Sequence, residues 1–571
     1  MLSDKLERYI KMTDVQENII GMVLLSMSNI QVAVTEELIS QMVDMQVEYY
    51  AKIGETPLTE EERNEVIATL HAKRLVRIDR GHCLKKKDHI PWYITAKANQ
   101  PNNFWERYRL YLIKKQQWNS QTVNELDKTT DEIMDLLGNP DQPKGFQRRG
   151  LCIGDVQSGK TSTYIGLINK AADAHYRVII LLTGTIEKLR RQTQHRIDEG
   201  FIGLDSYAFT LRRNSEQVGV GAINPNISGW AVTSTTSDFN AATANKIVGR
   251  LNDINAPVIF VLKKNKSVLG KLKDWLQFYN TNNTKNTKDN TPEIDLPMLL
   301  IDDEADYASV NTREDDITAI NKGIRELLVL FKKANYVGFT ATPYANIFID
   351  PDTDDEMLKH DLFPRDFIYA LEAPSNYIGA RSIYGEDAPY EYMLESNDDC
   401  EAVLPLKHKK QDTMTSVPTS LKEAIAAFFI CNAIRDLRRD TKSHRTMMIN
   451  VSRFIAVQNQ ITGLIDGYVR EVKREIQNYY LLGEKALQYP SIKFVKEVYD
   501  KFFAKNFLNQ DFSDLQHFQW EEIQQVLSPA ISRIEVRVIN GGNAPKNLNY
   551  QPEVCTESKY IHIRYTITCT M

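Results

Sequence analysis

Short apolar runs alternate with helical segments between residues 145 and 350, and this alternation constrains the fold more than any other feature of the chain. The runs cover residues 150–153, 178–182, 258–262, 298–301 and 336–339. Parallel strands need long crossover connections, usually helices, and buried parallel strands are continuously apolar. The pattern therefore predicts an α/β domain over residues 145–350, built on a parallel sheet with crossover helices.

Length and composition place the chain among globular proteins of several domains. It has 571 residues, of which 42% are hydrophobic, enough apolar material for more than one core. The 70 basic and 75 acidic residues give a net charge of −5, so no chain-wide positive field indicates a nucleic-acid partner. No apolar stretch approaches the roughly 20 residues of a membrane helix. Six scattered cysteines without a CxxC pair indicate free thiols, and we expect a cytoplasmic protein with no membrane segment.

The regions that flank the predicted α/β domain differ in pattern. Residues 1–100 are mainly helical, with a capping box at Thr59 and Glu62 and strand-like alternation over residues 74–81. A helix followed by a hairpin resembles a winged helix with Lys85, Lys86 and Lys87 on its wing. An ordinary small domain with a solvated charge run is simpler, and we favour it. The remaining regions are predicted as a helical connector, an insertion or linker, and an incomplete second α/β lobe, at residues 101–144, 351–418 and 419–571.

The segment Gly154-Asp-Val-Gln157-Ser158-Gly159-Lys160-Thr161 matches the phosphate-loop pattern GxxxxGK[ST]. It follows an apolar strand and precedes a helical run, which is the context that the mechanism of this motif requires. Glycines let backbone N–H groups wrap the phosphates, the lysine bridges the outer phosphates, and the threonine coordinates magnesium. The pattern predicts binding of ATP with magnesium, and a chance glycine turn is the alternative.

A carboxylate cluster follows the apolar run at residues 298–301. Its members are Asp302, Asp303, Glu304 and Asp306, and strand ends of this kind meet the phosphate loop in open α/β sheets. Residues 303–306 spell the motif that names the DEAD-box helicases. We therefore predict that Asp303 holds magnesium and that Glu304 is the general base, while Asp302 is a rival for the metal role. A solvated acidic turn is the simpler alternative for the motif taken alone.

Two further segments resemble elements of superfamily two helicases. Thr340-Ala-Thr342, after the last apolar run, resembles the element that links nucleotide state to the second lobe. Arg190, Arg191 and Gln194 fall where these proteins place a nucleic-acid contact, although a solvated helix face explains them equally well. Ser452 and Arg453 resemble a second-lobe contact to a nucleic-acid strand, and helix capping by the serine is an equal alternative.

Taken together, these strings resemble the Z-one domain family, bacterial proteins often named as endonucleases. The resemblance spans residues 90–560 and rests on the phosphate loop, the acidic cluster and four further strings: Ala171-Ala-Asp-Ala, Leu189-Arg-Arg-Gln-Thr-Gln, Gly338-Phe-Thr-Ala-Thr-Pro-Tyr-Ala-Asn and Asn450-Val-Ser-Arg-Phe. It implies a RecA-like, superfamily-two-like P-loop ATPase that acts on DNA, with partner proteins of restriction or phage defence. The second half of the chain would be the Z-one domain proper.

The chain also departs from the pattern of that family. Members continue past a strand matching residues 560–563 into a Gly-Gly turn, a Ser-Arg-Gly element and an arginine-finger motif, none of which we find here. We expect a frameshift or premature stop. Because an arginine finger contributes roughly 10³ to 10⁵ in turnover, the sequence predicts that the chain binds ATP and magnesium but hydrolyses ATP slowly unless another chain supplies the arginine.

Two other functions stay open at this stage. An acidic run at residues 350–359 prompts the idea of a magnesium-dependent endonuclease, but its spacing fits an exposed loop better than a two-metal site. The endonuclease interpretation therefore rests on family naming. A nucleotide-dependent switch or scaffold that binds partner proteins is the third hypothesis.

Overall fold

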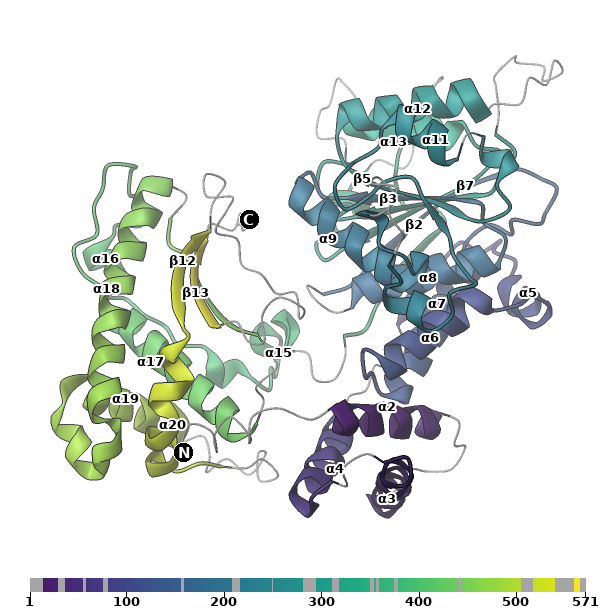
Figure 1. The fold of residues 1–571 in the computed structure, drawn as a ribbon. Coiled ribbons are helices and arrows are strands. Elements are labelled where there is room, and N and C mark those ends of the chain that lie inside the picture. Colours follow the sequence, from purple (N-terminus) through teal and green to yellow (C-terminus); the bar gives the residue numbers. More distant parts are fainter. Residues whose placement is uncertain are drawn as a thin grey trace. The chain divides into compact units, whose positions relative to one another are not determined.

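The computed structural model describes sixteen stretches of the chain, and they form two compact units, one over Met12–Glu391 and the other containing Tyr392–Met571 (Figure 1). The described residues are 14–28, 36–54, 58–74, 81–155, 159–207, 216–248, 250–280, 294–310, 318–349, 354–355, 359–373, 378–439, 444–452, 454–504, 517–539 and 559–564.

An eight-stranded sheet organises the first unit, in the order β1-β10-β2-β7-β6-β3-β5-β4. Every neighbouring pair is parallel except β1 with β10. The five predicted strands are β2 (Phe146–Ile153), β3 (Val178–Thr183), β5 (Val258–Lys263), β6 (Met298–Asp303) and β7 (Lys333–Thr340). The prediction of a mixed α/β fold with a mainly parallel sheet is therefore confirmed.

Two strands of this sheet come from outside the predicted boundaries of residues 145–350. β10 (Phe367–Ala370) pairs with β2, and β1 (His82–Lys85) pairs antiparallel with β10. The close approach of Phe367 depends on Gly150, where a Cβ atom would lie 2.0 Å from the Phe367 ring. Part of the predicted linker is thus a core strand, and β1 borders the sheet instead of forming a wing. Most of the strand predicted over residues 74–81 lies outside the described residues.

Alternate strand residues point to opposite faces of the sheet, as parallel buried strands require. One face packs on α6 (Asn103–Lys114), α7 (Ser120–Leu136) and α8 (Lys160–Asp173). The other face packs on α11 (Ala241–Ile247), α12 (Lys266–Asn280) and α13 (Ala319–Val329) (Figure 1). The helical connector predicted over residues 101–144 thus contains two helices with a break between them.

Within the described residues, four helices precede α6 in the chain: α2 (Asp14–Ser28), α3 (Glu36–Lys52), α4 (Glu60–Arg74) and α5 (Tyr93–Asn99). The capping box predicted at the start of α4 is present, because the Thr59 N–H donates to Glu62 Oε2 (2.8 Å) and the Glu62 N–H donates to Thr59 Oγ1 (3.3 Å). Short elements that complete the first unit are β4 (Trp230–Ala231), β8 (Asp354–Asp355), β9 (Lys359–His360), α14 (Tyr344–Ile347) and α15 (Ala380–Tyr384).

The second unit is also α/β. Its three-stranded sheet has the order β11-β13-β12, with both pairings parallel, and its strands are β11 (Arg445–Ile449), β12 (Glu535–Ile539) and β13 (Lys559–Arg564). Its helices are α16 (Cys400–Val403), α17 (Thr419–Leu437), α18 (Ile455–Tyr479), α19 (Pro490–Tyr499) and α20 (Trp520–Ser532). Apolar residues of these elements form one separate core.

Among the helices of the described residues, none is long and apolar enough to cross a membrane.

Candidate phosphate-binding site

The predicted phosphate loop joins β2 to α8 at the carboxyl edge of the parallel sheet. Gly159, at the N-cap of α8, has φ of +94°, a left-handed conformation that favours glycine. The Gly154 N–H donates to Thr340 O at 3.0 Å, which ties the start of the loop to the end of β7. Gln157 and Ser158 lie outside the described residues, so their predicted roles stay predictions.

Lys160 folds back over the loop. Its ammonium donates to Gly154 O and to Asp155 O, each at 2.7 Å. Burial lowers the pKa of Lys160, and the charge of Asp303 acts in the opposite direction. The ammonium thus donates to two neutral backbone carbonyls of the loop, where a phosphate would be an acceptor of higher charge.

The three acidic residues at the end of β6 have different surroundings. Asp302 is fully buried, forms an ion pair with Lys264 (2.9 Å) and accepts a hydrogen bond from the Tyr336 hydroxyl (2.7 Å). Because both of these partners are internal, Asp302 is a structural carboxylate and a poor rival for the metal role. Asp303 faces the phosphate loop, and burial together with the neighbouring charge of Glu304 raises its pKa to about 6.

Glu304 is exposed and has a left-handed backbone, with φ of +54°. Lys264 holds this conformation, because its ammonium donates to Glu304 O at 2.5 Å and to Tyr307 O at 3.0 Å. The carboxylate lies close to Gly184, the residue after β3, where a Cβ atom would be 2.9 Å from Glu304 Oε2. Lys264 after β5 and Gly184 after β3, two neighbouring strands, thus lie beside the residue that the sequence predicts as the general base.

The Thr340-Ala-Thr342 segment meets the acidic cluster directly. The hydroxyls of Thr340 and Thr342 each donate to a different carboxylate oxygen of Asp306, both at 2.6 Å. The Ala305 N–H donates to Phe339 O at 3.0 Å, so the backbone of the two segments is also joined. The structure thus brings together two motifs that the sequence analysis connected only by resemblance.

A cavity of about 560 Å³ opens beside the loop. Its polar lining includes Lys160, Thr161, Asp303, Arg196 and Glu199, and its apolar wall comes from α6 and the turn that follows it. The residues that line this wall are Tyr108, Tyr111, Leu112 and Trp118. Tyr108 and Tyr111 are buried core residues that also face the cavity.

The donor set fits a magnesium nucleotide. Thr161 and Asp303 offer a hydroxyl and a carboxylate to the same cavity, and hard oxygen ligands of this kind suit magnesium, which is normally bound by few protein ligands together with phosphates. Asp303 also lies beside the acidic Glu304, and a cation would stabilise two neighbouring carboxylates. Among the described residues, no atom lies within 4 Å of a Cβ atom added at the left-handed Gly159.

The predicted nucleic-acid residues lie on α9 (Glu187–Ile197) and divide into two groups. Arg190 is fully buried, contacts Glu187 (2.8 Å) and donates to Ser234 O (2.9 Å). Gln194 is also fully buried and hydrogen-bonded within the protein. Both side chains face inward because the buried side of α9 packs against the sheet, so neither is presented to a ligand. Arg191 keeps 55% of its side chain exposed.

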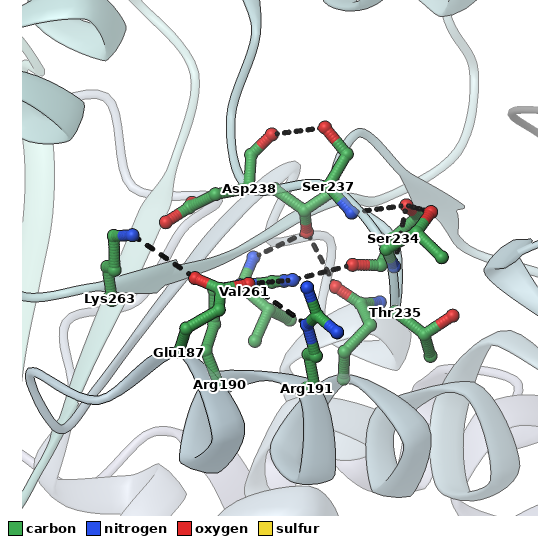
Figure 2. Close-up of polar contacts among 12 residues, drawn as sticks. Glu187, Arg190, Arg191, Ser234, Thr235, Ser237, Asp238, Val261 and Lys263 are labelled. Atoms are coloured by element: carbon green, nitrogen blue, oxygen red, sulfur yellow. Dashed lines mark hydrogen bonds and ion pairs between the residues drawn. The ribbon is translucent and has the colours of Figure 1, made fainter. Parts of the chain in front are cut away.

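Polar groups gather around Arg191 at the ends of β3, β4 and β5, as Figure 2 shows. Glu187 accepts contacts from Arg190, from Arg191 (3.5 Å) and from Lys263 (3.2 Å). Serine and threonine residues of the loop after β4 form internal turns beside them, with the Ser237 N–H donating to Ser234 Oγ at 3.0 Å. Arg191 is thus the one member of the predicted trio that the structure leaves on the surface.

In the second unit, Ser452 is buried, with 4% of its surface exposed. Its hydroxyl accepts from the Phe454 N–H (3.1 Å) and lies 2.8 Å from His408 Nε2. The bond from the Phe454 N–H comes from the N-cap residue of α18 and not from an N–H group of the first helical turn, so it forms a local turn before the helix and is not the predicted helix cap. Arg453 lies outside the described residues, and its predicted contact with nucleic acid stays a prediction.

Sequence reasoning missed three residues of this site. Lys264 follows an ordinary apolar strand, Gly184 follows another, and Arg196 is one basic residue among several in α9. Their roles arise from contacts with the acidic cluster or with Thr161, all distant in sequence. A lysine directly after a buried strand is a weak signal for Lys264, and nothing local distinguishes Arg196.

The first unit is therefore an α/β unit with a candidate phosphate-binding site at the carboxyl edge of its parallel sheet. Residues 420–563, in the second unit, match the profile of the Z1 domain. No curated protein matches the chain. The match to the Z1 domain agrees with the resemblance that the sequence motifs indicated for the second half of the chain.

Several solved structures show distant similarity. The helicase domain of Hef from Pyrococcus furiosus aligns at 12% identity over 70% of this chain and 74% of that one, with a TM-score of 0.26. The ATP-dependent Type ISP restriction-modification enzyme LlaBIII bound to DNA aligns at 12% identity over 73% and 23%, with a TM-score of 0.24. The SWI2/SNF2 ATPase core of Sulfolobus solfataricus in complex with dsDNA aligns at 10% identity over 78% and 77%, with a TM-score of 0.21. All three TM-scores lie below 0.5, so these likenesses establish neither fold nor function for this chain.

Proposed function

We propose that the protein binds ATP with magnesium and is a RecA-like P-loop ATPase acting on DNA. One observation carries this proposal: the phosphate loop, the Asp303–Glu304 pair and the threonines bound to Asp306 converge at one edge of one sheet. Three separate motifs that meet in this way form the parts that phosphoryl transfer requires, namely phosphate binding, metal binding and orientation of water.

Each residue has a distinct role in the proposed reaction. Backbone N–H groups at the start of α8 and the Lys160 ammonium bind the phosphates. Thr161 and Asp303 would hold magnesium, which when bound neutralises developing charge on the phosphate oxygens. Glu304 orients a water molecule and accepts its proton. Thr340 and Thr342, at the end of β7, donate two short hydrogen bonds to Asp306. Through these bonds, a change in the bound nucleotide alters the position of the end of β7.

The apolar wall of the cavity suits the nucleoside part of the ligand. Tyr111 and Trp118 offer ring surface, and the Gln116 amide, which donates to the Tyr111 hydroxyl at 2.7 Å, is a polar group beside them. Aromatic surface with a few fixed polar groups is the usual composition of small-molecule sites. The proposed nucleotide thus extends from the phosphate loop toward α6.

DNA contact is proposed for the surface around Arg191. The exposed guanidinium and the partly exposed Lys263 ammonium lie near hydroxyl-bearing residues of the loop after β4. Arginine, lysine and hydroxyl side chains supply most protein contacts to the phosphate backbone. A surface of this kind favours binding that is independent of sequence and sensitive to salt.

A role in bacterial restriction or phage defence, with partner proteins, is the biological setting that we propose. Its support is the Z1 match over residues 420–563 together with the motif resemblance. If the setting is right, cells that express the protein with its neighbouring genes resist phage, and Lys160→Ala abolishes that resistance. Equal resistance with the variant would contradict a defence role that depends on ATP.

Steady-state ATPase measurements with and without DNA test the proposed activity. We expect DNA to stimulate hydrolysis and Lys160→Ala to abolish it. Lys128→Ala is a matched control, because Lys128 is exposed on α7 and pairs with Glu125 of its own helix. Glu304→Gln should keep nucleotide binding and lower turnover by about 10²- to 10⁴-fold, the usual contribution of a general base.

Three other outcomes would replace the proposal. Magnesium-dependent DNA cutting that survives Lys160→Ala would indicate an endonuclease. Partner binding that changes with ATP while DNA has no effect would indicate a switch or scaffold. Full ATPase activity in Glu304→Gln would show that the general base is another residue.

A further inference from the structure

Arg196 is an arginine of the first unit whose head group lies on the phosphate site. Its Nη1 donates to the Thr161 hydroxyl at 3.2 Å, from the last turn of α9. The residue is exposed and lines the cavity together with Lys160 and Asp303. Arg196 thus stands beside the hydroxyl at which the proposed magnesium would bind.

The contact of Arg196 differs from that of a structural arginine. Arg190, which precedes Arg196 by six residues on the same helix, is fully buried and held by a carboxylate and a backbone carbonyl. Arg196 instead contacts a neutral hydroxyl at a longer distance. A neutral hydrogen bond of this kind contributes only about 0.5–1.5 kcal/mol net, so the guanidinium is released easily when a better acceptor arrives.

A magnesium ion and the guanidinium cannot both occupy the space at the Thr161 hydroxyl, because both are cations. Binding of a magnesium nucleotide therefore moves the Arg196 head group away from that oxygen. The triphosphate carries more negative charge than one magnesium ion neutralises, and the planar guanidinium matches phosphate oxygens with two parallel donors. The phosphates are the nearest new acceptors for a side chain that stays tethered to α9.

We propose that Arg196 contacts the outer phosphates of the bound nucleotide and stabilises the charge that develops during hydrolysis. This inference rests on the proposed function. In the reaction, a water oxygen forms a bond to the γ-phosphorus, the bond from that phosphorus to the β,γ-bridging oxygen breaks, and Glu304 takes the water proton. ADP leaves with the electron pair of the broken bond, and Arg196 donates to the oxygens that gain charge.

Arg196 also modifies the expectation of slow hydrolysis. That expectation assumed that the arginine of the site comes from a later motif or from another chain. An arginine on α9 supplies the same type of charge from within the lobe that holds the phosphate loop. Arginines that act on phosphoryl transfer in this way contribute roughly 10³- to 10⁵-fold in turnover.

The test compares Arg196→Ala and Arg196→Lys with the parent chain by two measurements. The first is the equilibrium affinity for Mg·ADP and for a magnesium complex of a non-hydrolysable ATP analogue, and the second is kcat for ATP. Arg109→Ala is the control, because Arg109 lies on α6, pairs with Glu106 of its own helix (2.8 Å) and is absent from the cavity lining.

We expect Arg196→Ala to weaken the triphosphate analogue by about tenfold to a hundredfold, the size of a lost charged hydrogen bond, with a much smaller effect on ADP. Its kcat should fall by about 10³-fold. Arg196→Lys should restore part of the affinity and little of kcat, because an ammonium lacks the two-pronged donor geometry.

If Arg196→Ala keeps the parent's preference for the triphosphate analogue over ADP, the inference is overturned. This holds even if the variant binds magnesium more tightly, because tighter magnesium binding alone would show that Arg196 only fills the metal position. If the proposed function itself is wrong, Lys160→Ala binds nucleotide as the parent does, or the parent binds none. Loss of binding in Lys160→Ala with no effect of Arg196→Ala refutes only the present inference.

Discussion

The buried ion pair between Lys264 and Asp302 gives a prediction whose magnitude follows from the structure. Both side chains are fully buried, and their charged atoms lie 2.9 Å apart. Lys264→Met would leave the Asp302 carboxylate buried with the Tyr336 hydroxyl as its remaining partner. Removing one member of a buried pair costs about 3–5 kcal/mol, because the other charge is left uncompensated. We expect a loss of that size in the free energy of unfolding of the first unit.

Urea unfolding followed by tryptophan fluorescence measures this loss, since five of the six tryptophans lie in the first unit, namely Trp92, Trp105, Trp118, Trp230 and Trp275. The double variant Lys264→Met/Asp302→Asn removes both charges and keeps a partner for the Tyr336 hydroxyl. It should recover at least half of the lost stability. A single variant within about 1 kcal/mol of the parent, or a double variant no more stable than the single one, would refute the assignment of a compensated buried pair.

Four further predictions concern the residues of the site. Gly184→Ala places a Cβ atom 2.9 Å from Glu304 Oε2 and should displace that carboxylate. We expect kcat to fall about tenfold or more with little change in nucleotide affinity. Unchanged turnover would contradict the placement of the general base. Asp306→Asn loses one of the two hydrogen bonds that Asp306 accepts from threonine hydroxyls. Stimulation of the ATPase by DNA should therefore fall more than the basal ATPase activity. An equal fall in both would exclude a role of Asp306 in coupling DNA binding to hydrolysis. Magnesium affinity should fall as pH drops below about 6, because the ionised form of Asp303 binds the metal, and Asp303→Asn should remove this dependence. Without metal, the raised pKa means that the stability contributed by protonated Asp303 is complete below pH 3.8 and lost as pH rises through about 6, which melting temperatures across that range should show.

The parts of the fold that the sequence predicts are those encoded in continuous segments. Each long apolar run forms a strand because it is buried on both faces, and the phosphate loop follows from glycines placed between a strand and a helix. β10 was missed, and β1 was predicted only as part of a hairpin, because both strands are short and their places in the sheet depend on distant partners. Phe367 reaches β2 only over Gly150, and no local pattern connects two residues so far apart.

The parts of the site that the sequence predicts are also those in continuous motifs. Lys160, Asp303 and Glu304 lie at one edge of the sheet because each follows or ends a parallel strand at its carboxyl end. Local sequence does not state which face of a helix is buried, so Arg190 and Arg191 look alike in sequence while only Arg191 is exposed. Residues such as Lys264 act through backbone atoms of a distant segment, and only the folded chain reveals such contacts.

Equilibrium binding of a fluorescent, non-hydrolysable magnesium ATP analogue tests the central claim most directly. The parent chain and the Lys128→Ala control should bind it, and Lys160→Ala should lose about tenfold to a hundredfold or more in affinity, since the lysine makes a charged contact to the phosphates. Chelation of magnesium should weaken binding to the parent as well. Equal affinity of the parent and Lys160→Ala would contradict the account, because the phosphate loop would then have no part in binding nucleotide.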